Sequence, residues 1–492
     1  MGLAQEPRER VEFGDFQTPD GLAGEICALL RRCGFEPASL VEPTCGRGSL
    51  LAAALQTFPS LRSATALDID AGHVRTAQTA IGGLAVAADT RVVEGDFFKT
   101  DWADVLRRHS DPLLVLGNPP WVTNAELGSL GSTNLPEKSN FQKHSGLDAI
   151  TGKSNFDISE WMLLEMLKWL QRRTATMAML CKTAVARKVL THAWKNDIAL
   201  QNADIFPIDA VTHFGAAVDA CLLVCTAGAA SSDCRVHQHL DIGGAYEKIG
   251  YRDGQLIADI SAYELRKHLQ GREIYRWRSG VKHDCASIME LRRCGSTLRN
   301  GLNEEVSLEE EYLYPMLKGS EIANGRGETS SRWMLVTQRS VGEDTLPIQR
   351  RAPMTWRYLE SHADALQKRA SSIYRKRPRF SVFGVGEYAF AAWKVAIAGL
   401  YKRLHFQVVG PIDGKPVVLD DTCYFVPCRT REEAEHLAAL LSSAIAREFF
   451  AAFIFWDAKR PITIDLLRRL DVIELSRALC VEHITRKHLS VS

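Results

Sequence analysis

The chain has 492 residues with 60 Lys and Arg against 59 Asp and Glu, and 46% of its residues are hydrophobic. This length suits two domains, each of which can bury its own core. The 12 cysteines form no CxxC pair, and no apolar stretch approaches the roughly 20 residues that span a bilayer, which excludes a zinc motif and a membrane anchor. We therefore expect a cytoplasmic monomer with reduced thiols, no bound metal and no contact with a membrane.

The first predicted ligand-binding feature is a glycine-containing loop. Residues 13–19 (FGDFQTP) precede a predicted amphipathic helix over 20–32, and residues 39–51 (SLVEPTCGRGSLL) then predict a short strand, an acidic turn and a helix of small residues. Gly46 and Gly48 let the backbone pass close to a ligand, and the helix behind them begins with free N–H groups. The loop lacks the glycine pattern of dinucleotide sites and the Gly-Lys-Ser/Thr of P-loops, so neither a dinucleotide nor a triphosphate is favoured.

A second strand is predicted to end in acidic residues. Residues 63–70 (SATALDID) are apolar up to Asp68 and end with Asp70. A carboxylate at the end of this strand can accept hydrogen bonds from both hydroxyls of a ribose. Asp68 is the first candidate for that role and Asp70 the second.

A third strand is predicted within residues 91–98 (RVVEGDFF). Asp96 can accept from an adenine amine, and Phe97 or Phe98 can pack on the ring. Strands that alternate with helices and end in polar ligand groups predict an α/β fold, with a doubly wound, mostly parallel sheet that binds its ligand along one edge.

The fourth strand leads into the stretch that we expect to carry the chemistry, residues 113–121 (LLVLGNPPW). Pro119 and Pro120 forbid both a helix and further sheet pairing, so the strand must stop there. The Asn118 side chain and the Pro119 carbonyl can hold a planar NH2 group, and Trp121 offers a flat face for a ring. An ordinary turn is the plain alternative, because Asn and Pro are common turn residues.

The rest of the N-terminal half predicts a loop on the substrate side and further elements of the sheet. Residues 122–155 are rich in Gly, Ser, Asn and Lys and are too long for a passive connection. A helix, a strand and a helix are predicted at 156–170, 174–180 and 184–195. Residues 210–226 predict two strands around a Phe-Gly turn, where Phe214 can close over a ring held by Asn118.

The small, polar residues 227–233 are the predicted linker, which divides the chain into domains 1–230 and 231–492. For the second domain the sequence predicts a mixed α+β structure, with strands at 415–419 and 422–426 and a long helix at 431–450. Residues 345–405 hold 12 Lys and Arg against three acidic residues, with aromatic residues between them. This combination suits phosphate contacts and base stacking, and a solvated basic helix face is the alternative.

The order of these motifs resembles that of the gamma class of S-adenosylmethionine-dependent DNA adenine-N6 methyltransferases. The resemblance covers roughly residues 10–226, with cofactor motifs first and the catalytic Asn-Pro-Pro-Trp second. Weaker similarity to the recognition domains of that class is found at 311–322, 374–390 and 420–426. Cys45 and Arg47 occupy variable places of the pattern, and Trp121 stands where Tyr is commoner.

The resemblance implies a role for each matched residue. It places the methionine end of S-adenosylmethionine near Phe16, Thr18 and Pro19. The cofactor would also be bordered by residues of the glycine loop, which are Glu42, Thr44, Gly46 and Gly48. Asp68 would bind the ribose, and Asp96 with Phe97 the adenine. The catalytic residues would be Asn118, Pro119, Pro120 and Trp121, with Trp121 and Phe214 stacking on the target base.

The function implied is a sequence-specific DNA adenine-N6 methyltransferase that flips its target base out of double-stranded DNA and has a separately encoded restriction endonuclease as counterpart. An RNA adenine or protein glutamine methyltransferase is the nearest alternative, since the same motif serves those amines. A restriction enzyme with its own nuclease domain and a non-catalytic DNA-binding subunit are the other two alternatives. Intact glycines and an intact catalytic motif disfavour the last of these.

Overall fold

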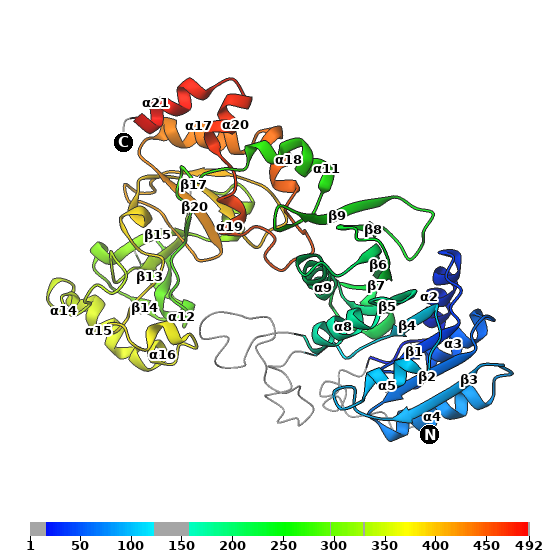
Figure 1. Ribbon diagram of the computed structural model, residues 1–492. Coiled ribbons are helices and arrows are strands. Elements are labelled where there is room, and N and C mark those ends of the chain that lie inside the picture. The colour runs from blue at the N-terminus through cyan, green and yellow to red at the C-terminus, as the bar shows by residue number, and fades with distance from the viewer. Residues whose placement is uncertain (1–15, 123–156, 296, 328–329, 491–492) are drawn as a thin grey trace. The chain divides into compact units, whose positions relative to one another are not determined.

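The computed structural model describes residues 16–122, 157–295, 297–327 and 330–490. The chain divides into two compact units, Met1–Asp259 and Ile260–Ser492, and each is described by itself (Figure 1). The predicted substrate-side loop at 122–155 lies outside the described residues except for its first residue, Val122.

The first unit is built on a ten-stranded sheet with the order β10-β9-β8-β6-β7-β5-β4-β1-β2-β3. Five neighbouring strands, β5, β4, β1, β2 and β3, run parallel to one another. Strand β7 lies between β5 and β6 and is antiparallel to both. The inner strands β1 and β4 are buried along their whole length, as parallel strands covered on both faces are. The predicted α/β fold with a mostly parallel sheet is confirmed. The strand bounds are β1 (Ser39–Glu42), β2 (Ser63–Asp68), β3 (Asp89–Glu94), β4 (Leu113–Gly117), β5 (Ala175–Lys182), β6 (Leu200–Ile208) and β7 (Ala220–Ala227).

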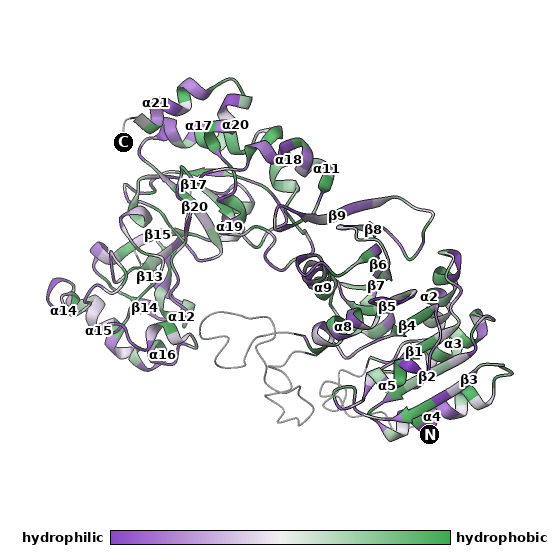
Figure 2. Ribbon diagram, viewed as in Figure 1, coloured by the Kyte–Doolittle hydropathy of each residue, from purple (hydrophilic) through white to green (hydrophobic). Residues whose placement is uncertain are grey.

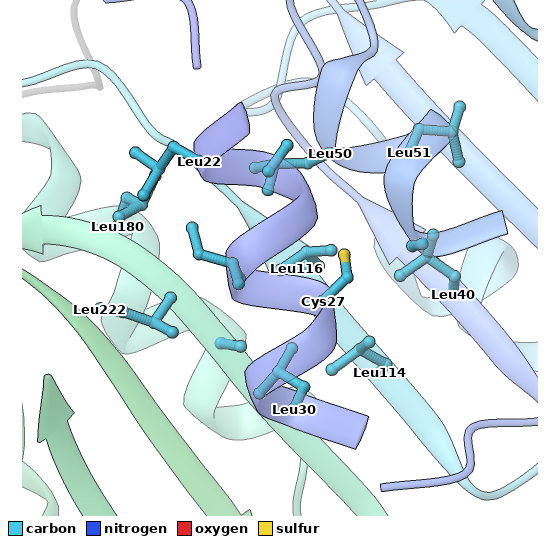
Figure 3. Close-up of a cluster of buried hydrophobic side chains, with 14 of the residues drawn as sticks. Leu22, Cys27, Leu30, Leu40, Leu50, Leu51, Leu114, Leu116, Leu180 and Leu222 are labelled. Atoms are coloured by element: carbon cyan, nitrogen blue, oxygen red, sulfur yellow. The ribbon is translucent and has the colours of Figure 1, made fainter. Parts of the chain in front are cut away.

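Helix α2 (Asp20–Arg32) has the predicted bounds and shows why the core forms here. Its apolar residues recur every three or four positions, so Leu22, Ile26 and Leu30 lie on one buried face. Figure 3 shows this face against leucines of the sheet, among them Leu114 and Leu222. Burial of each such side chain contributes about 2 kcal/mol. The other helices of the sheet region are α3 (Ser49–Thr57), α4 (Ala71–Gly82), α5 (Trp102–Arg107), α8 (Ile158–Trp169) and α9 (Thr183–Lys195).

The prediction of two strands within residues 210–226 is half wrong. The first part forms a short helix, α10 (Ala210–Phe214), because the Asp209 carboxylate accepts from the backbone N–H groups of Val211 and Thr212 at 3.1 and 3.0 Å. Gly215 then ends the helix with φ 65°, a left-handed conformation that glycine adopts without strain. The second part is the predicted strand, β7, and its antiparallel partner β6 was not predicted.

The predicted domain boundary after residue 230 falls inside the first unit. Strand β8 (Asp233–His237) pairs parallel with β6, and β9 (Tyr246–Arg252) and β10 (Gln255–Ile257) extend the same sheet. Residues 227–233 are therefore a connection between two strands of one sheet. These residues were predicted to be a domain linker because a turn between two strands needs the same small and polar residues as a linker does.

The second unit has two smaller sheets, with the orders β11-β20-β17-β18 and β14-β13-β12-β16-β15-β19. All described pairings within them are antiparallel apart from β15 with β19. The strand bounds are β11 (Arg278–Ser279), β12 (Glu290–Cys294), β13 (Thr297–Asn300), β14 (Glu305–Val306), β15 (Leu313–Leu317), β16 (Arg332–Leu335), β17 (Trp393–Ala398), β18 (Gln407–Val409), β19 (Val418–Leu419) and β20 (Cys423–Cys428).

Short helices accompany these sheets, and those at the surface carry both hydrophobic and hydrophilic residues in Figure 2, as amphipathic helices do. Their bounds are α11 (Ile260–Arg266), α12 (Ala286–Met289), α13 (Gly319–Ala323), α14 (Ile348–Arg351), α15 (Pro353–Ser361), α16 (Ala363–Gln367), α17 (Arg431–Leu441), α18 (Ala444–Ala451), α19 (Ile464–Leu467), α20 (Val472–Ala478) and α21 (Glu482–Ser490). The single helix predicted at 431–450 is two, because Ser443 caps a new start by accepting from the N–H of Ala446. Within the described parts of the chain, no helix combines the length and hydropathy needed to cross a membrane.

Candidate active site

The motifs of the first unit meet at the carboxyl ends of neighbouring strands. β4, β1 and β2 lie side by side in the sheet and lead into Asn118, Glu42 and Asp68. A Cβ added to Gly117 would lie 3.6 Å from the Thr44 hydroxyl, so the glycine loop and the Asn-Pro-Pro-Trp loop approach each other closely. The carboxyl edge of a parallel sheet is where α/β proteins bind their ligands.

The Asn118 amide is held on one side and open on the other. Its Nδ2 donates to the Phe16 carbonyl at 2.7 Å and lies 3.3 Å from the Thr18 hydroxyl. Its Oδ1 is buried and has no hydrogen-bond partner among the residues that the structure describes. Pro19 follows as the residue that precedes α2, so the start of that helix fixes the segment that orients the amide. Pro119 is buried and Pro120 half-buried beyond it.

Unpartnered polar atoms gather at this edge of the sheet. Nine buried side-chain nitrogen or oxygen atoms lack a partner among the described residues, and four of them belong to the two loops: Glu42 Oε2, Thr44 Oγ1, Asn118 Oδ1 and Trp121 Nε1. Buried polar groups in proteins nearly always have a hydrogen-bond partner. A group of them without partners therefore indicates where a polar ligand binds.

Glu42 is the most unusual of these residues because it is only 1% exposed. Burial raises the pKa of its carboxyl well above the ordinary value, and the negative charge of Asp68 raises it further. An ionised carboxylate here needs a positive partner. The described residues supply none within ion-pair distance, so a cationic ligand group would satisfy it.

The glycines of the glycine loop are required by close packing. Gly46 and Gly48 have φ of 51° and 85°. A Cβ on Gly48 would lie 2.8 Å from Cβ of Ala77, and one on Gly46 would overlap the Gln17 amide. The same Gln17 oxygen accepts from the N–H of Arg47 at 2.9 Å, so the segment before α2 also holds this loop.

Asp68 and Asp70 have different roles in the structure. Asp68 accepts from the N–H of Gly46 at 2.8 Å with one oxygen and from the N–H of Asp70 at 2.9 Å with the other. Asp70 caps α4 by accepting from the N–H groups of Gly72 and His73, and the His73 hydrogen bond is the main cause of its lowered pKa. Asp68 is therefore the carboxylate at the edge of the glycine loop, while Asp70 is used by the helix.

Asp96 and Phe97 form a turn after β3. Asp96 accepts from the N–H of Phe98 at 2.9 Å, and its other oxygen lies 3.0 Å from the Lys99 ammonium. Phe97 is 6% exposed and stacks on Trp169 with ring centroids 5.8 Å apart. The structure thus places Phe97 in an aromatic cluster, and Asp96 at its rim.

Trp121 and Phe214, the two rings predicted to stack on a target base, contact each other with ring centroids 5.1 Å apart in an edge-to-face arrangement. Phe16 packs against both rings, at 5.5 and 6.3 Å. Trp121 and Phe214 are 4% and 5% exposed, so the rings form a closed wall. A base could stack there only after these rings move apart.

Two residues of this edge were missed by sequence reasoning. Gln17 bonds the glycine loop, and Ile69 exposes 43% of its surface between Asp68 and Asp70. Single exposed apolar residues are common on protein surfaces, so nothing in the sequence marks Ile69 as part of this edge.

No protein-family model matches the chain. The chain is 42% identical over 476 residues to the type II methyltransferase M.NspV of Nostoc sp. (strain ATCC 29411 / PCC 7524), which covers 96% of this chain and 98% of that protein. The chain belongs to the type II methyltransferases. Among solved structures it is similar to the type IIL restriction-modification enzyme MmeI in complex with DNA, with a TM-score of 0.52 and 13% identity over 92% of this chain and 64% of that one. That likeness concerns the fold.

Membership of the type II methyltransferases confirms the coarser part of the predicted activity, a methyltransferase of restriction-modification systems. Because the alignment with M.NspV covers 96% of the chain, the similarity to that methyltransferase extends over both units.

The second unit of this type II methyltransferase keeps most of the predicted basic residues on its surface. Ten of the twelve in 345–405 are exposed: Arg350, Arg351, Arg357, Lys368, Arg375, Lys376, Arg377, Arg379, Lys402 and Arg403. Arg369 packs on the Tyr374 ring at 3.6 Å, and Lys394 is buried. The prediction that the aromatic residues between them are free for stacking is wrong for three, since Trp356, Tyr358 and Phe380 belong to a hydrophobic core.

Proposed function

We propose that this type II methyltransferase transfers the methyl group of S-adenosylmethionine to the N6 amine of an adenine flipped out of double-stranded DNA. The observation that carries the proposal is the Asn118 amide. Phe16 and Thr18 hold its nitrogen, so its buried oxygen is fixed without a partner. A fixed acceptor beside a second carbonyl, that of Pro119, fits an exocyclic NH2 group, which has two hydrogens to donate.

The residues at the sheet edge fit the proposed cofactor. Gly46 and Gly48 let the loop pack closely against Gln17 and Ala77, and this close packing carries the backbone into the N-terminus of α3. Glu42 is a buried carboxyl with no positive partner among the described residues, and S-adenosylmethionine carries positive charge on its sulfur and its amino group. Asp68 would accept from the ribose hydroxyls. When bound, the sulfonium supplies a methyl group already activated for transfer.

The chain's own contribution is to prepare and place the amine. An amine on an aromatic ring is a poor nucleophile because its lone pair is delocalised into the ring. Asn118 Oδ1 and the Pro119 carbonyl would accept its two hydrogens and favour a geometry in which the lone pair is free. Positioning of this kind can supply much of the rate enhancement. The amine nitrogen takes the methyl group as the carbon–sulfur bond breaks and a neutral thioether is left, and the surplus proton of the amine passes to water.

DNA is the proposed substrate because the family relative is a type II methyltransferase and the similar MmeI structure contains DNA. A base within a duplex cannot reach a socket at the sheet edge, so it has to be flipped out at a cost of a few kcal/mol. Trp121 and Phe214 would part to stack on it. We assign catalysis to the first unit, and target recognition and phosphate contacts to the second, with a separately encoded endonuclease as counterpart.

Single-molecule sequencing of DNA from cells that express the protein tests this proposal. We expect N6-methyladenine at one recurring sequence, and its loss with Asn118→Ala, for which kcat should fall by about 1,000-fold. The matched control is Asn202→Ala, which removes an exposed asparagine of β6 and should leave methylation unchanged.

Cofactor affinity separates a catalytic loss from a folding defect. Calorimetry should give the same Kd for S-adenosylmethionine with Asn118→Ala as with the wild type. An Asn118→Ala protein that methylates DNA fully would contradict the proposal, as would a wild type that leaves adenine in DNA unmodified. Methylation of an RNA adenine or of a protein glutamine, with no methylation of DNA, would support the proposed role of Asn118 and Pro119 in binding an amine but would change the substrate.

A further inference from the structure

The loop that carries Asn118 has unusually few backbone donors of its own. β4 pairs with β5 up to Gly117 opposite Met179, and the ladder then stops. Pro119 and Pro120 have no N–H to give to a neighbour. A loop of this kind is held by whatever binds its carbonyl groups and side chains. On the side of Asn118 that support comes from Phe16, and the other side needs a second support.

Lys182 supplies this second support. Its ammonium donates to the Trp121 carbonyl at 2.9 Å and to the Asp157 carboxylate at 2.7 Å. Lys182 is the last residue of β5, the strand next to β4, so its backbone is fixed by the sheet. Only 24% of its side-chain surface is exposed.

Asp157 is fixed as firmly as its partner. It is 5% exposed, and its second oxygen accepts from the Ser159 hydroxyl at 2.6 Å and from the Ser159 N–H at 3.1 Å, which caps α8. One residue further on, the N–H of Ile158 donates to the Val122 carbonyl at 3.0 Å. The lysine therefore joins the exit of the Asn-Pro-Pro-Trp loop, the start of α8 and the end of β5.

We propose that Lys182, fixed by Asp157, is a positioning residue for methyl transfer, which deepens the proposed function and rests on it. Both acceptors of the amine, Asn118 Oδ1 and the Pro119 carbonyl, precede the Trp121 carbonyl by at most three residues. Release of that carbonyl moves the two acceptors relative to the cofactor loop. A displacement of about 1 Å is enough to lower a rate about 100-fold.

The first test removes both charges together, because Lys182→Met alone would leave a buried carboxylate without a partner. For Asp157→Asn/Lys182→Met we expect kcat to fall about 100-fold. KM for DNA and Kd for S-adenosylmethionine should stay within about twofold, since positioning changes the rate and not these contacts. The activity is measured with purified full-length protein on DNA that contains the sequence found by single-molecule sequencing.

A second ion pair of the same kind provides the control. Lys188 of α9 pairs with the buried Glu160 of α8 at 2.8 Å, and among the described residues this lysine has no hydrogen bond to the Asn-Pro-Pro-Trp loop. Glu160→Gln/Lys188→Met should lower the unfolding midpoint about as much as the first double variant while kcat stays near the wild-type value. Lys182→Arg, which keeps a donor and a charge, should restore part of the rate.

Two results would overturn the inference. The first is a kcat for Asp157→Asn/Lys182→Met equal to that of Glu160→Gln/Lys188→Met. The second is a fall in the rate of Asp157→Asn/Lys182→Met that is fully accounted for by a smaller fraction of folded protein. Failure of the proposed function is distinguishable, because the wild type would then form no N6-methyladenine in DNA. The Lys182 variants would in that case be compared on the amine that the wild type does methylate.

Discussion

Glu42 in the first unit and Lys394 in the second are each only 1% exposed, yet their surroundings differ. Glu42 ends β1 at the carboxyl edge of the sheet, with the negative Asp68 nearby and one oxygen that has no partner in the described parts of the chain. Lys394 lies within β17, donates to the Ala391 carbonyl and sits 5.9 Å from the centre of the Phe425 ring. Glu42 is therefore buried beside polar atoms that lack hydrogen-bond partners, whereas Lys394 is buried in a core where its ammonium has an acceptor.

This difference separates a ligand site from a structural position. Burial is the main cause of both pKa shifts, upward for Glu42 and downward to about 7 for Lys394. A shifted pKa alone would not distinguish the ligand site from the structural position, since burial shifts any ionisable group toward its neutral form. The unpartnered oxygen does, because a cationic ligand would satisfy it, whereas Lys394 already has an acceptor.

Among the changes that test this comparison, Glu42→Gln should have the largest effect on cofactor affinity. We expect affinity for S-adenosylmethionine to fall about 30-fold, because the cationic cofactor loses its buried negative partner. The cofactor-free variant should unfold at a higher temperature than the wild type, since a buried acid is removed. Calorimetry and thermal unfolding measure the two effects, and equal cofactor affinity in both proteins would show that Glu42 is structural.

Lys394→Met should stabilise the second unit without changing methylation. The lysine pKa is about 7 in the folded protein and near 10.5 in the unfolded chain, so the unfolded chain binds more protons between these values. The unfolding free energy contributed by this group then rises with pH by up to about 1.4 kcal/mol per unit, and its unfavourable effect is greatest below about pH 7. The difference between wild type and Lys394→Met in urea unfolding should shrink as the pH rises.

Glu42 should give the opposite pH dependence. Its folded pKa is raised above the ordinary 4.5, so the folded protein holds a proton that the unfolded chain releases. Its contribution to stability is complete below about pH 4.5 and is lost as the pH rises toward the raised value. Cofactor binding should strengthen over the same range, because a cationic ligand favours the ionised carboxylate. Glu42→Gln should abolish this dependence in calorimetric titrations at several pH values.

Asp68→Asn should have a smaller effect on the cofactor. An amide oxygen can still accept from the N–H of Gly46 and hold the glycine loop, but the amide nitrogen cannot accept from the N–H of Asp70, and one acceptor for the ribose is lost. We expect Kd for S-adenosylmethionine to rise about tenfold. An unchanged Kd in calorimetry would mean that Asp68 serves only to hold the glycine loop.

The sequence was most informative where one local pattern decides the structure. The bounds of α2 and β4 follow from apolar spacing and from the prolines after Gly117, and the sheet edge follows from the polar residues at strand ends. Sequence reasoning failed where a single contact outweighed the pattern. The Asp209 carboxylate made α10 from a segment with strand-like composition, and Trp356 became core although it lies among surface arginines.

The partners of site residues were beyond prediction for a different reason. The sequence predicts a role for Asn118, but the orientation of its amide depends on the Phe16 carbonyl 102 residues earlier in the chain, and the loop exit depends on Lys182. Backbone carbonyls carry no sequence signal, and a lone lysine at a strand end has many possible roles. Only the paired strands show which distant groups reach the loop.

The smallest effects should come from the exposed basic residues of the second unit, and Lys394 provides their control. Arg375 and Lys376 are exposed, so each phosphate contact they make would release a counterion from DNA. Arg375→Ala/Lys376→Ala should weaken binding to all DNA sequences alike and reduce the slope of log affinity against log salt by about 2. Lys394→Met removes the same residue type from a buried position and should leave that slope unchanged. Equal slopes for all three proteins would place the DNA-contacting surface elsewhere.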